Sequence, residues 1–142
     1  MCLFTYREKP FVASDDIVTY KWLTPKHTFF SRLFGTIKKL KSPVMNFEYK
    51  LGKTYSTTFK ESEVKQRLYR KFEGKMISKG FHSNASRNNF NYSHPNGVNP
   101  TVLVKCIIPK GTRYYTSESD IPTSDIEIVS ECIILKEIAN FN

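Results

Sequence analysis

The sequence lacks any apolar stretch long enough to cross a bilayer as a helix. Such a helix needs about 20 consecutive apolar residues, and none of the 142 residues belongs to a run of that length. The first ten residues, MCLFTYREKP, also lack the apolar core and small-residue cleavage site of a signal peptide. We therefore expect a cytoplasmic protein with no membrane partner.

Patterns typical of metal sites are missing as well. The three cysteines form no CxxC pair, and Cys106 and Cys132 lie in apolar runs, where free thiols pack as small hydrophobes. His27 and His94 have none of the spacings of paired zinc ligands. The sequence predicts no metal site and no disulfide.

What is abundant is positive charge, and it is unevenly distributed. The formal net charge is +9. Residues 1–80 contain 17 Lys and Arg against 7 Asp and Glu, whereas residues 81–142 contain 5 against 6. This asymmetry indicates a basic face with an anionic partner, although the charge could instead serve solubility alone.

The composition, with 39% hydrophobic and 14% aromatic residues, is that of a globular protein. We expect one domain over residues 1–142, with 1–16 as a lead-in segment. The apolar run 102–108 ends at Pro109 and Gly111, which predicts a central strand and a turn. Further strands are expected over 17–23, 45–51, 54–59, 112–116 and 126–136.

Two segments have the apolar spacing of helices. Residues 61–73 carry Val64, Leu68 and Phe72 at intervals of four, and 27–41 forms a basic amphipathic segment that is either a helix or a mobile loop. Strands with two inserted helices predict an α+β fold, with a mixed or antiparallel sheet of about six strands.

Five blocks of the sequence are distinctive: DIVTYKWL (16–23), SPVMNFEYKLGKTY (42–55), GFHS (80–83), VLVKCIIPKGTRYY (102–115) and IVSECIIL (128–135). In these blocks the chain resembles a family of uncharacterised proteins found in bacteria and their phages. A phage-encoded member would be expected in the host cytoplasm. More distantly, the chain is similar to the ADP-ribosyltransferase-like fold. Residues 81–86 look like its Ser-Thr-Ser element, and 107–111 look like its Ile-Pro-x-Gly turn.

That second resemblance implies a site for NAD and roles for several residues. Glu131 looks like the catalytic glutamate, which would stabilise the positive charge that develops as nicotinamide leaves. Lys21 would take a phosphate, and His82 and Ser83 would contact the nicotinamide ribose or amide. Tyr20 and Lys21 stand where the family has Arg or His. Tyr20 and Tyr114 complete the predicted ligand site.

The residues themselves support these assignments in part and leave alternatives open. His82 could shuttle a proton or merely bond to backbone in a turn, and Glu131 could be functional or a salt-bridged strand residue. The tyrosines interleaved with lysines could stack bases or form the core. A basic patch is predicted at Arg32, Lys38, Lys39 and Lys41.

Two functions follow from the sequence. The first is a phage- or mobile-element-associated ADP-ribosyltransferase-like domain that binds a nucleotide-like anionic ligand, and its cofactor would be NAD if it is an enzyme. The second is a non-enzymatic basic protein that binds nucleic acid or an acidic host protein, for example as an inhibitor of host defence.

Overall fold

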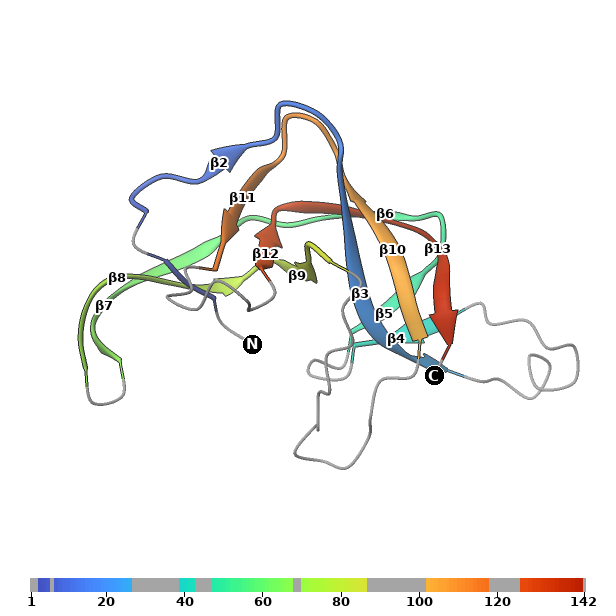
Figure 1. Cartoon of the computed structure of the whole chain (residues 1–142), viewed down its shortest axis with the longest axis horizontal. Helices are drawn as coiled ribbons and strands as arrows, with labels where there is room; N and C mark the ends of the chain where they lie inside the picture. Colours follow the sequence, from blue (N-terminus) through green and yellow to red (C-terminus); the bar gives the residue numbers. More distant parts are fainter. Residues whose placement is uncertain are drawn as a thin grey trace, which may run out of the picture.

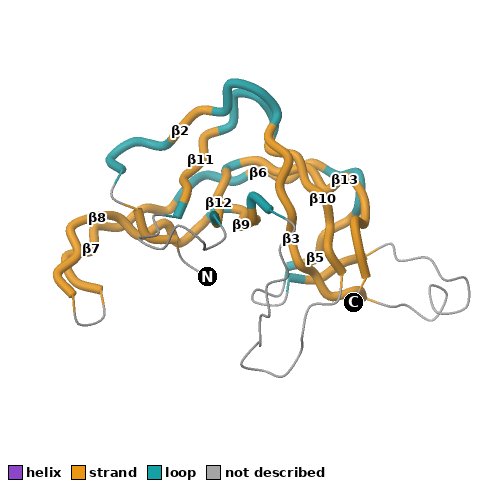
Figure 2. Tube along the Cα trace, viewed as in Figure 1, coloured by secondary structure: helices purple, strands orange, loops and turns teal. Residues whose placement is uncertain are grey.

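The computed structural model of the chain describes residues 3–5, 7–26, 39–42, 47–67, 70–86, 102–117 and 126–141 (Figure 1). Within these ranges all of the regular secondary structure is β-strand (Figure 2). The strands are β1 (Leu3–Thr5), β2 (Phe11–Val12), β3 (Ile17–Lys26), β4 (Lys39–Lys41), β5 (Glu48–Lys50), β6 (Thr54–Ser56), β7 (Lys60–Arg67), β8 (Arg70–Lys79), β9 (Phe81–Asn84), β10 (Val102–Ile108), β11 (Arg113–Thr116), β12 (Glu127–Ser130) and β13 (Cys132–Phe141). In this part of the chain, no helix is long and apolar enough to span a membrane.

Ten of these strands form one large antiparallel sheet. Its order is β2-β11-β12-β9-β3-β10-β13-β6, and β4 pairs with both β3 and β5. The strand predicted to be central, β10, lies between β3 and β13 and is buried at five of its seven residues. The remaining three strands form a smaller sheet of order β1-β8-β7, in which β7 and β8 make a long hairpin that extends away from the other strands (Figure 1).

The α+β prediction is wrong for the described residues, because the predicted helix over 61–73 lies in the β7–β8 hairpin. A helix there would bury only three apolar side chains, whereas most helical stability in proteins comes from packing such a face. The extended backbone instead pairs β8 with both β1 and β7, and it places Ile77 in the core opposite Leu3. Tertiary pairing therefore outweighs the local apolar spacing.

The second predicted helix, over 27–41, lies mostly outside the described residues. Its last three residues form strand β4. Strand β3 continues to Lys26, so the prediction that this strand ends at residue 23, before Pro25, is also wrong. Proline lacks an N–H and is tolerated where a strand is paired on one side only. The pairing of β3 with β10 ends at Leu23, and Pro25 pairs with Leu40 of β4.

The apolar segment expected as one strand over 126–136 is divided at Glu131. Strand β12, before the break, pairs with β9 and β11. Strand β13, after the break, pairs with β10 and β6. At Glu131 the chain thus passes from one pair of neighbouring strands to another. As a result, Val129 before the break and Ile133 after it are buried in two different apolar clusters.

Two apolar clusters hold the strands together. The larger cluster lies among β3, β4, β5, β9, β10 and β13, and Val104, Cys106 and Leu135 are fully buried in it. Burial raises the pKa of the Cys106 thiol to about 12. The smaller cluster consists of Leu3, Ile77, Tyr115 and Val129 with Phe59 packed against it, and it joins the three-stranded sheet to the large one.

Gly80 is required where these two sheets meet. An added Cβ at this position would lie 2.5 Å from Cγ2 of Val129 and 3.1 Å from a ring carbon of Phe59. We expect Gly80→Ala to lower the free energy of unfolding by about 1–3 kcal/mol, as overpacking of a core does. Urea denaturation measures this loss.

Gly52→Ala is the control for Gly80→Ala. Gly52 also has a positive φ, of 78°, but nothing lies within 4 Å of its added Cβ. The control therefore carries the backbone strain without the clash. Equal losses of stability in the two variants would contradict the close packing at Gly80.

Candidate functional site

Four of the predicted ligand residues lie on two adjacent strands. Tyr20 and Lys21 belong to β3, and His82 and Ser83 belong to β9. These strands pair at one point, where Tyr20 lies opposite Asn84. The other two predicted residues are placed elsewhere: Tyr114 lies in β11 and Glu131 at the break after β12. The structure thus separates the predicted site into two groups.

His82 is held by a carboxylate that sequence reasoning missed. Its Nδ1 lies 2.7 Å from Oε1 of Glu127. Glu127 is two residues from Val129, the register partner of His82 on β12, so the two side chains share one face of the sheet. When Nδ1–H donates to the carboxylate of Glu127, a neutral His82 presents a lone pair at Nε2. That nitrogen is buried and has no hydrogen-bond partner within the described ranges.

Lys21 and Ser83 lie on the opposite side of the same strands. Because neighbouring side chains of a strand alternate, Ser83 points away from the face of His82. Its hydroxyl is buried and, among the described residues, has no partner. The Nζ of Lys21 donates to the backbone oxygen of His82 at 2.5 Å, and it lies 5.4 Å from the ring centroid of Tyr49. Burial lowers the pKa of Lys21, partly opposed by the nearby Cys106 and Glu127.

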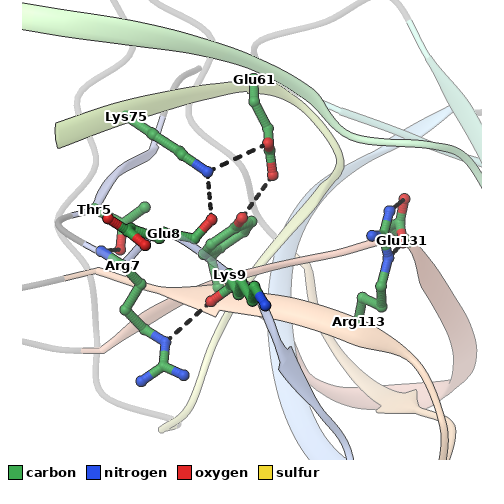
Figure 3. Close-up of polar contacts among 9 residues, drawn as sticks. Thr5, Arg7, Glu8, Lys9, Glu61, Lys75, Arg113 and Glu131 are labelled. Carbon is green, nitrogen blue, oxygen red and sulfur yellow. Dashed lines mark hydrogen bonds and ion pairs between the residues drawn. The ribbon is translucent and has the colours of Figure 1, made fainter.

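Glu131 is occupied by an ion pair. Its carboxylate accepts two hydrogen bonds from the guanidinium of Arg113, one of them 2.9 Å long (Figure 3). It accepts a third, of 3.0 Å, from the backbone N–H of Phe59. The hydrogen bonds from Arg113 lower the pKa of Glu131, and burial opposes this only in part. In this arrangement the carboxylate joins β11 to the segment before β7, so its evident role is to connect strands.

Tyr114, the remaining predicted ligand residue, packs against the lead-in segment. Its ring is stacked on that of Phe11 in β2, with centroids 5.3 Å apart. Strand β11 pairs with both β2 and β12, and Tyr114 lies opposite Ser130. The hydroxyl of Ser130 is a further buried group with no partner in the described residues.

The predicted basic patch is only partly described. Arg32 and Lys38 lie outside the described residues, whereas Lys39 and Lys41 flank the fully buried Leu40 on β4. The register adds two lysines that the sequence pattern did not reveal. Lys39 is paired with Lys26 of β3 on one side and with Lys50 of β5 on the other. We call Lys26, Lys39 and Lys50 the lysine row.

A second basic surface lies on the β7–β8 hairpin, residues Lys60–Arg67 and Arg70–Lys79, which we call the basic arm. Its register pairs residues of like charge at two points, where Lys60 is the partner of Lys79 and Arg67 is the partner of Arg70. Residues 64–72 at its end include four basic residues and no acidic one. At its base, Glu61 is bound by the hydroxyl of Tyr115 at 2.6 Å and by Lys75 at 3.7 Å (Figure 3).

Comparisons with protein-family models, with curated protein sequences and with solved structures gave no match. Inference about function therefore rests on the arrangement of side chains and charges in this chain.

The ion pair between Glu131 and Arg113 should make the free energy of unfolding depend on pH. Because the pKa of Glu131 is lowered in the folded state, its stabilising effect is present above the unfolded pKa of about 4.3. That effect is lost as the pH falls through the lowered folded value. We expect Glu131→Gln to lower the free energy of unfolding by about 1 kcal/mol at pH 7, since Arg113 is half exposed. The variant should also lose less stability on acidification.

Urea denaturation at pH 7 and at several values down to pH 3 tests this prediction. Glu137→Gln is the matched control, because Glu137 is exposed and lies 4.0 Å from Lys105. A Glu131→Gln protein that denatures like this control at every pH would show that the ion pair does not stabilise the fold.

Proposed function

We propose that this protein binds nucleic acid through the basic arm. The observation that carries the proposal is the register of the hairpin, in which Arg67 lies opposite Arg70 and Lys60 lies opposite Lys79. Like charges that face each other across a strand pair destabilise it. A phosphate backbone neutralises such charges and releases counterions on binding. These two pairs are therefore unfavourable for the free protein and favourable for a complex with a polyanion, whereas Glu63 and Lys75, also paired in the register, are of opposite charge.

The way in which the arm is anchored also supports this function. Acidic side chains lie at its base, where Glu61 is engaged by Tyr115 and Lys75, and Ile77 is fully buried in the smaller cluster. Between Glu63 and Glu73, residues 64–72 at the end of the arm are all basic or uncharged. A fixed base and a basic end suit an element that follows the phosphates of a strand.

The lysine row supplies a second set of positive charges. Its three lysines are register partners across β3, β4 and β5, so residues of like charge again pair in the sheet. Both surfaces belong to the half of the chain that holds most of the +9 net charge. Contacts at two separate basic surfaces predict a steep dependence of affinity on salt.

The test is binding of a fluorescent oligonucleotide by wild type and by Arg67→Ala/Arg70→Ala, measured by anisotropy over a range of salt concentrations. The double variant should bind more weakly, and its slope of log affinity against log salt should be smaller by about 1–2. It should also be equally or more stable, by roughly 0.2–1 kcal/mol, because the repulsion is removed. A loss of affinity together with a gain of stability is the signature of charges kept for a ligand.

Lys110→Ala/Lys136→Ala removes the same net charge from exposed positions away from the arm and serves as the control. Equal affinities and slopes for wild type and the arm variant would overturn the role of the arm. Binding of polyglutamate in preference to every oligonucleotide would instead identify an acidic protein as the partner and overturn the assignment to nucleic acid.

A second candidate function is the binding of a nucleotide-like anionic ligand at His82. It is favoured by Nε2 of His82, which is buried, has no partner in the described part of the chain, and is oriented by Glu127. A buried polar group without a partner is costly, and a ligand that donates a hydrogen bond would remove that cost.

Thermal shifts with NAD, ADP-ribose and mononucleotides test this second function. A ligand at about a hundred times its dissociation constant adds about 2.7 kcal/mol, which is on the order of 5–10 °C for a domain of this size. His82→Ala should abolish the shift and Lys136→Ala should retain it. A shift that persists in His82→Ala, or no shift with any nucleotide, would contradict a site at His82.

A further inference from the structure

An exposed aromatic ring lies at the edge of the larger apolar cluster. Phe47 comes directly before β5, and 42% of its surface is exposed. Its ring is edge-on to a tyrosine of β5 and a tyrosine of β6, with centroids 4.8 Å from Tyr49 and 5.7 Å from Tyr55. A third ring, that of Phe81, lies 6.4 Å away. Phe47 thus packs against three aromatic rings and still remains partly exposed to solvent.

The support under Phe47 is well fixed. Tyr49 is 4% exposed and Phe81 is 8% exposed, so both are part of the core. The hydroxyl of Tyr55 accepts a hydrogen bond of 2.8 Å from the backbone N–H of Lys50, and the oxygen of Phe47 accepts one of 2.9 Å from Ser42. A ring held in this way loses little conformational freedom when a ligand stacks on it.

An exposed positive charge lies near this ring. The Nζ of Lys53 lies 5.4 Å from the centroid of Tyr55, whose ring packs against Phe47. The side chain of Lys53 is exposed. A flat apolar ring beside an ammonium group is complementary to a base and its phosphate.

We propose that Phe47 stacks on an unpaired base, so that the nucleic acid bound by this protein is single-stranded. This inference rests on the proposed function and specifies the class of nucleic acid. Every base has a π-face that suits such a ring, whereas the bases of a duplex are already stacked on one another. The basic arm contacts phosphates, which single and double strands both offer, and Phe47 provides the distinction between them.

The experiment compares a 20-nucleotide oligothymidine with a duplex of equal length, using wild type, Phe47→Ala and Phe47→Leu. Both variants should bind the single strand about tenfold more weakly, which corresponds to about 1.4 kcal/mol. Their affinity for the duplex and their salt slopes should be unchanged, because no charge is removed. Phe47→Leu keeps an apolar side chain over Tyr49 and Tyr55 but has no flat ring, so it serves if Phe47→Ala unfolds.

Val12→Ala is the control for loss of exposed apolar surface, since Val12 on β2 is 61% exposed. This variant should bind the single strand like wild type. Phe47→Trp should retain affinity for the single strand, and its added emission over that of Trp22 should be quenched on binding. Equal binding of single strand and duplex by wild type would overturn the inference.

The failure of this inference is distinguishable from that of the proposed function. Unchanged single-strand affinity in Phe47→Ala and Phe47→Leu, with weakened binding in Arg67→Ala/Arg70→Ala, would overturn stacking at Phe47 and leave the arm as the interface. No binding of any oligonucleotide by wild type at low salt would overturn both.

Discussion

The carboxylate of Glu131 connects parts of the chain that the sheet alone would leave separate. The strands on either side of it, β12 and β13, pair with different neighbours, so the backbone must change direction between them. At that point Glu131 accepts hydrogen bonds from Arg113 and from the backbone of Phe59. The backbone of Glu131 adds bonds to Arg113 and Thr57. Ser130 and Ile133, which lie close to Glu131 in the chain, are both fully buried. The hydrogen bonds of Glu131 fix the backbone between them.

The hydrogen bonds of Glu131 help to fix the positions of the two proposed nucleic-acid surfaces, the basic arm and the aromatic site at Phe47. Phe59, bonded to Glu131, packs against Tyr115 in the smaller cluster and leads directly into the basic arm. On the other side, β13 pairs with β6, whose Tyr55 supports Phe47. The arm and the aromatic site are therefore extensions of one framework of strands.

The sequence allowed most of the strands to be predicted but neither the helix content nor the contacts at the candidate sites. Runs of β-branched residues identified β3 and β10 correctly, since such residues favour strands wherever they are buried. Spacing at intervals of four suggested a helix at Val64, Leu68 and Phe72, but the pairing of β7 with β8 keeps the segment extended. His82 was recognised and its partner Glu127 was not, because 45 residues separate them. Phe47 was likewise indistinguishable from a core residue, since exposure is a property of the folded chain.

The sequence by itself determined which segments are apolar enough to be buried, where positive charge is concentrated, and that Cys106 lies among hydrophobes. Each of these depends on the character of a residue and its immediate neighbours. The tertiary structure alone decided that Glu131 forms an ion pair with Arg113. It also decided the register that aligns Lys26, Lys39 and Lys50 across three strands and makes Arg67 the partner of Arg70 on the basic arm. The reason is that strand register joins residues far apart in the chain, and a shift of one residue would turn every side chain to the other face.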